Sequence, residues 1–244
     1  MAKDGRRHVL AIGGLRAPDV IGRTAGGVPL LLDYAAQLSG SANPRICVLN
    51  TAVGDEPTGF VKMLDHFSAL PSRVSRLQLF PMPNVADPAD LLLGQDLIFV
   101  GGGSVANMLA VWRVHGLDQV MRSAWEAGVV LAGVSAGAIC WFAGGTTDSF
   151  GPLRPFTDGL GLLPGSYCPH YDSEPARRPL YNDLVAKGAL PAGIACDDGA
   201  AAHFIDDDLA EIVTDRPDAH GFSVSRVGDA TAAETPLPAR LLGN

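Results

Sequence analysis

The segment 133–137, with the sequence GVSAG, most constrains how this 244-residue chain can fold. The apolar run from Val129 to Ala132 predicts a buried strand before it, and the run from Ala136 to Phe142 predicts a helix after it. Such a tight turn needs small residues two positions before and after its centre, and glycine stands at both. We therefore expect the Ser135 hydroxyl to project from the sheet, close to the first free N–H groups of the helix. This suits a nucleophile, although an ordinary capped turn has the same pattern.

Strands and helices alternate along the first 140 residues. Apolar runs predict strands over 8–14, 45–50, 74–80, 96–100 and 129–132, and helices over 29–38, 57–70, 87–93, 105–114 and 117–127. This alternation predicts an α/β fold with a mostly parallel sheet flanked by helices on both faces. Ligand sites in such sheets lie at the carboxyl ends of the strands.

Two of the predicted strands end in glycine. The three glycines 101–103 follow the fourth strand, where their N–H groups can turn toward a ligand, as in an oxyanion hole. A flexible turn capped by Ser104 is the alternative. The first strand ends in Gly13-Gly14 without completing a G-x-G-x-x-G pattern, which argues against a dinucleotide site. We expect the glycines 101–103 and Ser135 to face one crevice.

The pattern changes after Trp141. The stretches 144–152 and 159–165 are rich in turn residues and predict active-site loops and an antiparallel addition. A helix over 175–187, a strand over 193–196 and a hairpin with arms at 200–205 and 209–214 follow. The tail, 228–244, has little pattern. We expect a single domain over residues 1–244.

Charge and cysteine content limit the function classes. A net charge of −8 disfavours nucleic acids and anionic membranes, because both attract positive surfaces. Four widely spaced cysteines without a C-x-x-C pair predict neither a disulfide framework nor a zinc site, and reduced thiols fit the cytoplasm. The apolar run from Val9 to Ile12 is too short for a signal peptide or a membrane span. We expect no metal and no cofactor.

A serine nucleophile needs a base, and two of the six histidines are candidates. His203 alternates with apolar residues in a hairpin arm, which favours a structural position. His170 lies in a Cys-Pro-His-Tyr loop at a strand end and is the better base. The other four histidines occupy strand, helix or turn positions where packing or solvent contact is expected.

Four motifs in this order resemble the peptidase E family of serine peptidases, which includes α-aspartyl dipeptidase and the related cyanophycinases. They are 99–104 (FVGGGS), 133–138 (GVSAGA), 168–171 (CPHY) and 197–199 (DDG). The resemblance extends from the first strand to about Phe204 and implies a fold like that of class I glutamine amidotransferases, with a nucleophile elbow. It implies Ser135 as nucleophile and His170 as base. Gly102 and Ala136 would form the oxyanion hole, with Gly103 as the neighbouring alternative.

The family's third triad residue is a glutamate before a glycine, and Asp198 stands at the matching position, with a side chain one methylene shorter. Asp148 is its rival, because its loop could fold over the same crevice. Asp172 and Glu174 are expected to cap the helix that begins near Pro175. Asp197 would point away from His170 if the segment is extended.

The family's dipeptidases hold an N-terminal aspartyl carboxylate with an arginine of the helix after the histidine. Arg177 matches that position, and Arg178 stands beside it. The resemblance thus implies cleavage of Asp-X dipeptides through an acyl-enzyme. The alternatives are a cyanophycinase-like hydrolase of β-aspartyl-arginine units and a non-catalytic binding protein. A thiol amidotransferase fits less well, because the turn carries serine and Cys140 lies further along the helix. The expected partner is a small peptide, with the chain either alone or as a homodimer.

Overall fold

A computed structural model describes residues 5–15 and 22–243, and its larger sheet has eight strands. Their order across the sheet is β14-β11-β10-β1-β5-β4-β2-β3. The bounds are β1 (His8–Ile12), β2 (Arg45–Leu49), β3 (Arg73–Leu77), β4 (Leu97–Val100), β5 (Val130–Val134), β10 (Ala200–Ile205), β11 (Asp208–Thr214) and β14 (Ala239–Leu241). The segment between the predicted strand 8–14 and the predicted helix 29–38 includes residues 16–21, which lie outside the described residues.

The five strands β1, β5, β4, β2 and β3 run parallel, as the alternation predicts. Helices cover both faces: α1 (Leu30–Leu38) and α2 (Pro57–Ser68) on one, α3 (Pro88–Leu93), α4 (Val105–Val114) and α5 (Leu117–Glu126) on the other. In β1, Leu10 and Ile12 pack toward the first face, and Val9 and Ala11 toward the second. Successive side chains of β1 thus point to opposite faces of the sheet, and because helices cover both faces, every side chain of the strand is buried.

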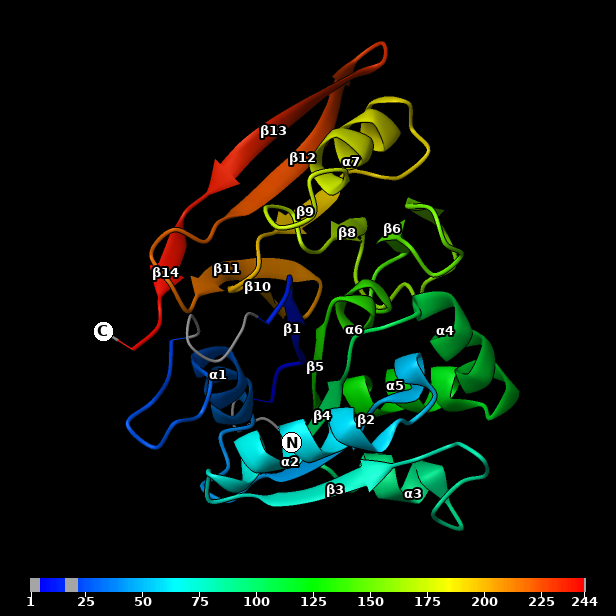
Figure 1. The fold of residues 1–244 in the computed structure, drawn as a ribbon, viewed down its shortest axis with the longest axis vertical. Helices are drawn as coiled ribbons and strands as arrows, with labels where there is room; N and C mark the ends of the chain where they lie inside the picture. Colours follow the sequence, from blue (N-terminus) through cyan, green and yellow to red (C-terminus); the bar gives the residue numbers. More distant parts are fainter. Residues whose placement is uncertain (1–4, 16–21, 244) are drawn as a thin grey trace.

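A second sheet of six strands lies above the first in Figure 1. Its order is β13-β12-β9-β8-β6-β7, with β6 (Gly144–Thr147), β7 (Arg154–Phe156), β8 (Ser166–Cys168), β9 (Gly193–Cys196), β12 (Gly221–Gly228) and β13 (Thr231–Leu237). Helix α7 (Arg177–Ala186) packs on it through a separate apolar cluster that includes Tyr181 and Phe222. The expected antiparallel pairing is found between β6 and β7, while β8 runs parallel to β6 and β9, and these segments form a sheet and a core of their own.

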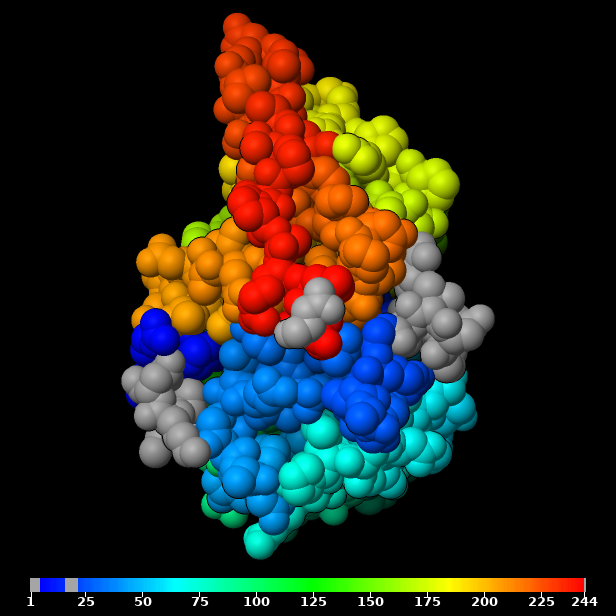
Figure 2. Space-filling view, turned by 90° about the vertical axis from the view of Figure 1, so that its left-hand side faces the viewer, coloured from blue at the N-terminus to red at the C-terminus, as the bar shows by residue number. Residues whose placement is uncertain are grey.

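The C-terminal tail is also more regular than its sequence indicates. Strand β13 pairs with β12 in a long antiparallel hairpin, and β14 then returns to the first sheet beside β11. The space-filling view shows this hairpin projecting at one end, with the chain descending from it toward α1 (Figure 2). Six of the seven β13 residues are polar, alanine or proline, so the segment lacks an alternating apolar pattern.

The two sheets are joined where β9 continues into β10. The link, 197–199, carries the DDG motif, and Gly199 N–H donates to the carbonyl of Gly14 at the end of β1. The sheet arrangement therefore places this motif beside the carboxyl ends of β1 and β5. Across residues 5–15 and 22–243, no helix has the length and apolar character needed to cross a membrane.

His203 of β10 is a buried structural histidine. Its Nε2 lies 3.0 Å from Nδ1 of His8, and its Nδ1 lies 2.9 Å from the hydroxyl of Tyr34, which donates to Glu211. Burial, reinforced by the neighbouring His8, lowers the pKa of His203 to about 4. The folded protein therefore favours the neutral ring.

This lowered pKa predicts a loss of stability in acid. An unfolded histidine binds a proton below about pH 6.5, so the contribution of neutral His203 is complete above that pH and lost as the pH falls toward 4. We expect the melting temperature of the wild type to drop more between pH 7 and pH 5 than that of His203→Gln. The exposed His115, changed to Gln, serves as the control and should keep the wild-type drop. An equal drop in all three proteins would contradict this role of His203.

Candidate active site

Ser135 occupies a strained turn between β5 and the short helix α6 (Ala136–Ile139), which ends earlier than expected. Its φ of 55° and ψ of −115° lie where few non-glycine residues are found. A β-carbon at Gly133 would lie 2.1 Å from the carbonyl oxygen of Gly137, and one at Gly137 would lie 2.2 Å from that of Val100. Both glycines are thus required for the strand and helix to approach this closely.

His170 lies next to this serine. It follows β8 in a loop where its own φ is 53°, and its Nε2 lies 2.9 Å from the Ser135 Oγ. The side chain keeps about a fifth of its surface exposed, so a substrate can reach the pair. A positive φ at a histidine is uncommon, and strain of this kind is concentrated at functional sites.

Asp198 completes the chain of hydrogen bonds. Its Oδ1 lies 2.7 Å from Nδ1 of His170, on the side of the ring opposite Ser135. Asp148 is exposed on the loop after β6. The Asp197 side chain accepts the backbone N–H of His220 instead, and burial followed by the nearby Asp172 charge raises its pKa. Of the four aspartates, Asp198 is the one that the structure brings to His170.

Gly14 makes room for this contact. A β-carbon at Gly14 would lie 1.8 Å from the Asp198 Oδ1 and 2.7 Å from the His170 Nδ1. Any other residue would displace one of the two side chains. Sequence reasoning missed this role, although the glycine pair directly after the first strand was a signal.

The glycines after β4 lie beside the serine. A β-carbon at Gly102 would be 3.2 Å from the Ser135 Cβ, so the Gly102 backbone approaches the hydroxyl closely. Gly103 has a φ of 134° and packs against the carbonyl of Ala52, where a β-carbon would lie 2.5 Å away. Ala136 opens the helix directly after Ser135. The Gly102 and Ala136 backbones are thus both neighbours of the serine.

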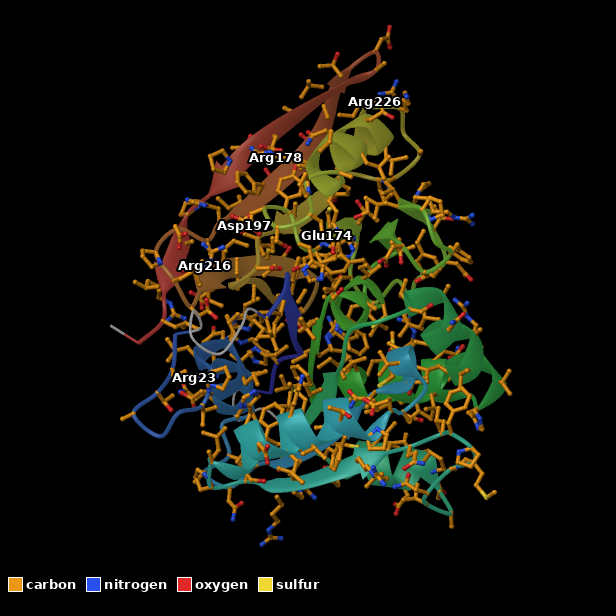
Figure 3. All side chains as sticks on the ribbon, in the orientation of Figure 1. Arg23, Glu174, Arg178, Asp197, Arg216 and Arg226 are labelled. Carbon is orange, nitrogen blue, oxygen red and sulfur yellow. The ribbon has the colours of Figure 1, made fainter. Side chains whose placement is uncertain are left out.

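The two candidate arginines have different surroundings. Arg177 is buried, and its Nε donates to Glu174 while its Nη1 donates to the carbonyl of Thr146. Arg178 is half exposed and pairs with Glu234 on the C-terminal hairpin, toward which it points in Figure 3. Its guanidinium is thus used to hold the hairpin.

The expected capping roles of Asp172 and Glu174 are wrong. Glu174 pairs with the Arg177 side chain, and Asp172 accepts the backbone N–H of Asp198. The helix begins two residues later than expected, at Arg177, and no side chain caps its first turn. Neither carboxylate therefore accepts from the free N–H groups at the start of this helix: Glu174 contacts a side chain, and Asp172 contacts a backbone group far away in the sequence.

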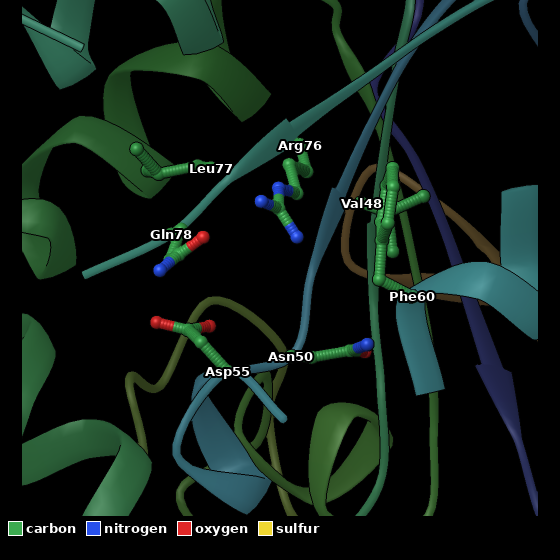
Figure 4. A pocket seen from close by; sticks show the side chains of 7 residues that line it. All are labelled: Val48, Asn50, Asp55, Phe60, Arg76, Leu77 and Gln78. Carbon is green, nitrogen blue, oxygen red and sulfur yellow. The ribbon is translucent and has the colours of Figure 1, made fainter. Parts of the chain in front are cut away.

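A small cavity at the ends of β2 and β3 is too small for a peptide. It is lined by Val48, Asn50, Asp55, Phe60, Arg76, Leu77 and Gln78 (Figure 4). Its volume of about 10 Å³ is near the lower limit for one water molecule. The Asp55 Oδ1 is buried there without a hydrogen-bond partner among the described residues, and a water is the ligand that fits.

Cys140 lies close to the serine turn but is buried and inert. Its Sγ donates to the carbonyl of Gly137, and burial raises the pKa of the thiol well above its usual range. A thiolate nucleophile is therefore disfavoured. In the described part of the chain, no three His, Cys, Asp or Glu side chains are grouped to hold a metal ion.

Comparison with known proteins adds to this geometry. A model of peptidase family S51 matches residues 24–212. The uncharacterized peptidase YgaJ of Bacillus subtilis is 45% identical over 210 residues, which cover 86% of this chain and 90% of that protein. A peptidase E of Shewanella amazonensis is 39% identical over 89 residues, 35% of this chain and 37% of that protein. A solved peptidase from an acI-B1 Actinobacterium shares the fold, with a TM-score of 0.68, 16% identity and 96% of each chain covered.

Proposed function

The chain belongs to peptidase family S51, and we propose that it removes N-terminal aspartate from small peptides through an acyl-enzyme. The family match confirms the predicted class, a serine-type peptidase related to peptidase E. One observation carries the proposal: hydrogen bonds connect Ser135 through His170 to Asp198. A nucleophile, a base and an orienting acid need this order of contacts.

In the proposed reaction, the Ser135 Oγ attacks the scissile carbonyl carbon while Nε2 of His170 takes the hydroxyl proton. His170 then gives that proton to the leaving amine, and the aspartyl group remains as an ester on Ser135. A water molecule then attacks this ester while His170 takes one of its protons, and the aspartate leaves as His170 gives that proton to the Ser135 Oγ. Asp198 holds the other ring nitrogen and stabilises the charged imidazole.

The turn geometry supports the proposal of a nucleophile elbow on a fold like that of class I glutamine amidotransferases. Ser135 has a positive φ at the end of a parallel strand, between two glycines that the packing requires. We assign the oxyanion hole to the N–H groups of Gly102 and Ala136, since both backbones adjoin the hydroxyl. Donors held by backbone need no rearrangement as the negative charge develops.

Arg177 is our candidate for binding the substrate's aspartyl carboxylate. Its Nη2 has no hydrogen-bond partner among the described residues, whereas Arg178 uses both Nε and Nη2 on Glu234. A guanidinium suits a carboxylate because it offers parallel N–H donors. In a chain of net charge −8, this buried cation also supplies the local positive charge that an anionic substrate needs.

The proposal predicts a specific role for Arg177 in catalytic efficiency. Asp-Leu should be cleaved far faster than Asn-Leu or Ala-Leu, because a neutral residue leaves the buried charge unpaired. Arg177→Ala should lower kcat/KM on Asp-Leu roughly a hundredfold or more, with little effect on Ala-Leu.

Arg178→Ala on the same helix is the matched control, and melting temperatures check that each variant is folded. Equal losses on both dipeptides would make Arg177 structural. A selective loss in Arg178→Ala would transfer the assignment to that residue. Turnover of β-aspartyl-arginine but not Asp-Leu by the wild type would favour the cyanophycinase-like alternative.

A further inference from the structure

The peptide groups of Asp198 are held from both sides by two side chains that lie far away in the sequence. The Asp198 N–H donates to Oδ1 of Asp172 over 2.8 Å. The Asp198 carbonyl accepts from Nε and Nη2 of Arg216 over 3.1 and 2.7 Å. Nη2 of Arg216 also pairs with Oδ2 of Asp172 over 2.8 Å, so the contacts form a closed ring around the Asp198 backbone.

The Arg216 side chain is buried and held by several partners in this position. Its side chain is only 8% exposed, and the remaining nitrogen, Nη1, pairs with Asp218 over 2.6 Å. Gly199 has a φ of 82°, and a β-carbon there would lie 2.5 Å from Oδ1 of Asp215 and 3.0 Å from Nε of Arg216. Glycine thus leaves the space that these two side chains fill. Burying a cation costs free energy unless all its donors are paired, and here every nitrogen has an acceptor.

The location of Asp198 explains why such a ring would matter. It lies on the link between β9 and β10, with Arg216 just beyond the end of β11 (Figure 3). An aspartate has only two side-chain torsions, so the position of its carboxylate follows that of its backbone. Gly14 blocks movement on the far side, because its backbone already adjoins the Asp198 Oδ1. A small displacement of this link would stretch the 2.7 Å contact with His170.

We propose that Arg216 and Asp172 are positioning residues for the reaction: they fix the Asp198 backbone so that its short carboxylate reaches His170. This inference rests on the proposed role of Ser135, His170 and Asp198, but not on the proposed Asp-X specificity. It differs from a purely structural role, in which Arg216 would only fasten the end of β11 to the link. In that case the effect of replacing Arg216 on the reaction rate would not depend on whether Asp198 is present.

The test uses the full chain and a fluorophosphonate probe. In that reaction the Ser135 Oγ bonds to phosphorus, fluoride leaves and His170 takes the proton, so the labelling rate reports the triad without a peptide substrate. We expect Arg216→Gln to lower this rate about a hundredfold, because a misplacement of about 1 Å can have that effect. Asp172→Asn should lower it less, and Arg216→Lys should not restore it, since lysine lacks the planar fork. With a cleaved dipeptide, kcat should fall and KM should not change.

A double-mutant cycle separates positioning from fold stability. In the Asp198→Asn background, Arg216→Gln should change the labelling rate less than about threefold, since Arg216 acts through Asp198. Asp218→Asn, which removes the charge of the exposed partner of Nη1 but keeps an acceptor oxygen for it, should label at the wild-type rate. Melting temperatures identify unfolded variants, and Asp172→Asn tests the ring independently if Arg216→Gln fails to fold.

The outcomes distinguish this inference from the proposed function. The positioning role would be overturned if Arg216→Gln lowered the labelling rate equally in the wild type and in Asp198→Asn. It would also be overturned if Arg216→Gln and Asp172→Asn were both labelled at the wild-type rate. Labelled wild type that does not cleave Asp-Leu would overturn the Asp-X specificity, while the labelling cycle would still decide the role of Arg216. Wild type that takes no probe would overturn both, because no activated serine would exist to be positioned.

Discussion

Ser135→Ala is expected to lower kcat on Asp-Leu about a million-fold, as commonly found when a serine nucleophile is removed. The fold should be unaffected, because the change deletes one hydroxyl at a turn already surrounded by small residues. The measurement is steady-state hydrolysis at high enzyme concentration, with the melting temperature as the check on folding. A variant that keeps even a tenth of the wild-type rate would contradict a serine mechanism.

His170→Ala provides the companion experiment. His170 and Ser135 are in direct contact, and residues that act as one unit give losses that do not multiply. We therefore expect a nearly equal loss in His170→Ala and no further loss in the double variant. Losses that multiplied would mean that the two side chains act separately.

The central sheet could be predicted because its information is local. Four of the five parallel strands are short, mainly apolar runs bounded by turn residues, while the edge strand β3 mixes apolar and polar residues. The connecting helices have their own start or stop signals, such as Pro57 and Pro88 in the first turns of α2 and α3. The second sheet could not be assigned in this way. Its strands β6, β7 and β8 have only three or four residues, and β6 consists of two glycines and two threonines.

The same difference between local and long-range information applies to the residues of the candidate site. The GVSAG turn makes Ser135 a candidate from five residues of sequence, because its glycines are required there, although an ordinary capped turn has the same pattern. The surroundings of Asp198 have no local signature, since Gly14, Asp172 and Arg216 meet there only after the two sheets have formed. Asp172 shows the limit clearly: next to a predicted helix start, a carboxylate favours a cap, yet its partners lie 26 and 44 residues away.

Asp198→Asn is expected to lower kcat about ten-thousand-fold, while Asp148→Asn should mainly raise KM. An asparagine keeps the shape of Asp198 but favours the wrong histidine tautomer, because its amide can donate to Nδ1 where the carboxylate accepts. The Asp198 Oδ1 lies 2.7 Å from that nitrogen, whereas the Asp148 side chain is exposed.

The two variants should be compared at equal folded concentration, because each replaces one carboxylate oxygen with an amide nitrogen, while only the Asp198 side chain contacts His170 in the structure. Asp197→Asn is a further control, since Asp197 adjoins Asp198 in sequence but contacts the backbone of His220. It should keep most of the wild-type kcat. If the large loss of kcat occurred in Asp148→Asn and Asp198→Asn remained active, the loop after β6 would have to close over His170 during turnover. The assignment of Asp198 as the acid that orients His170 would then be wrong.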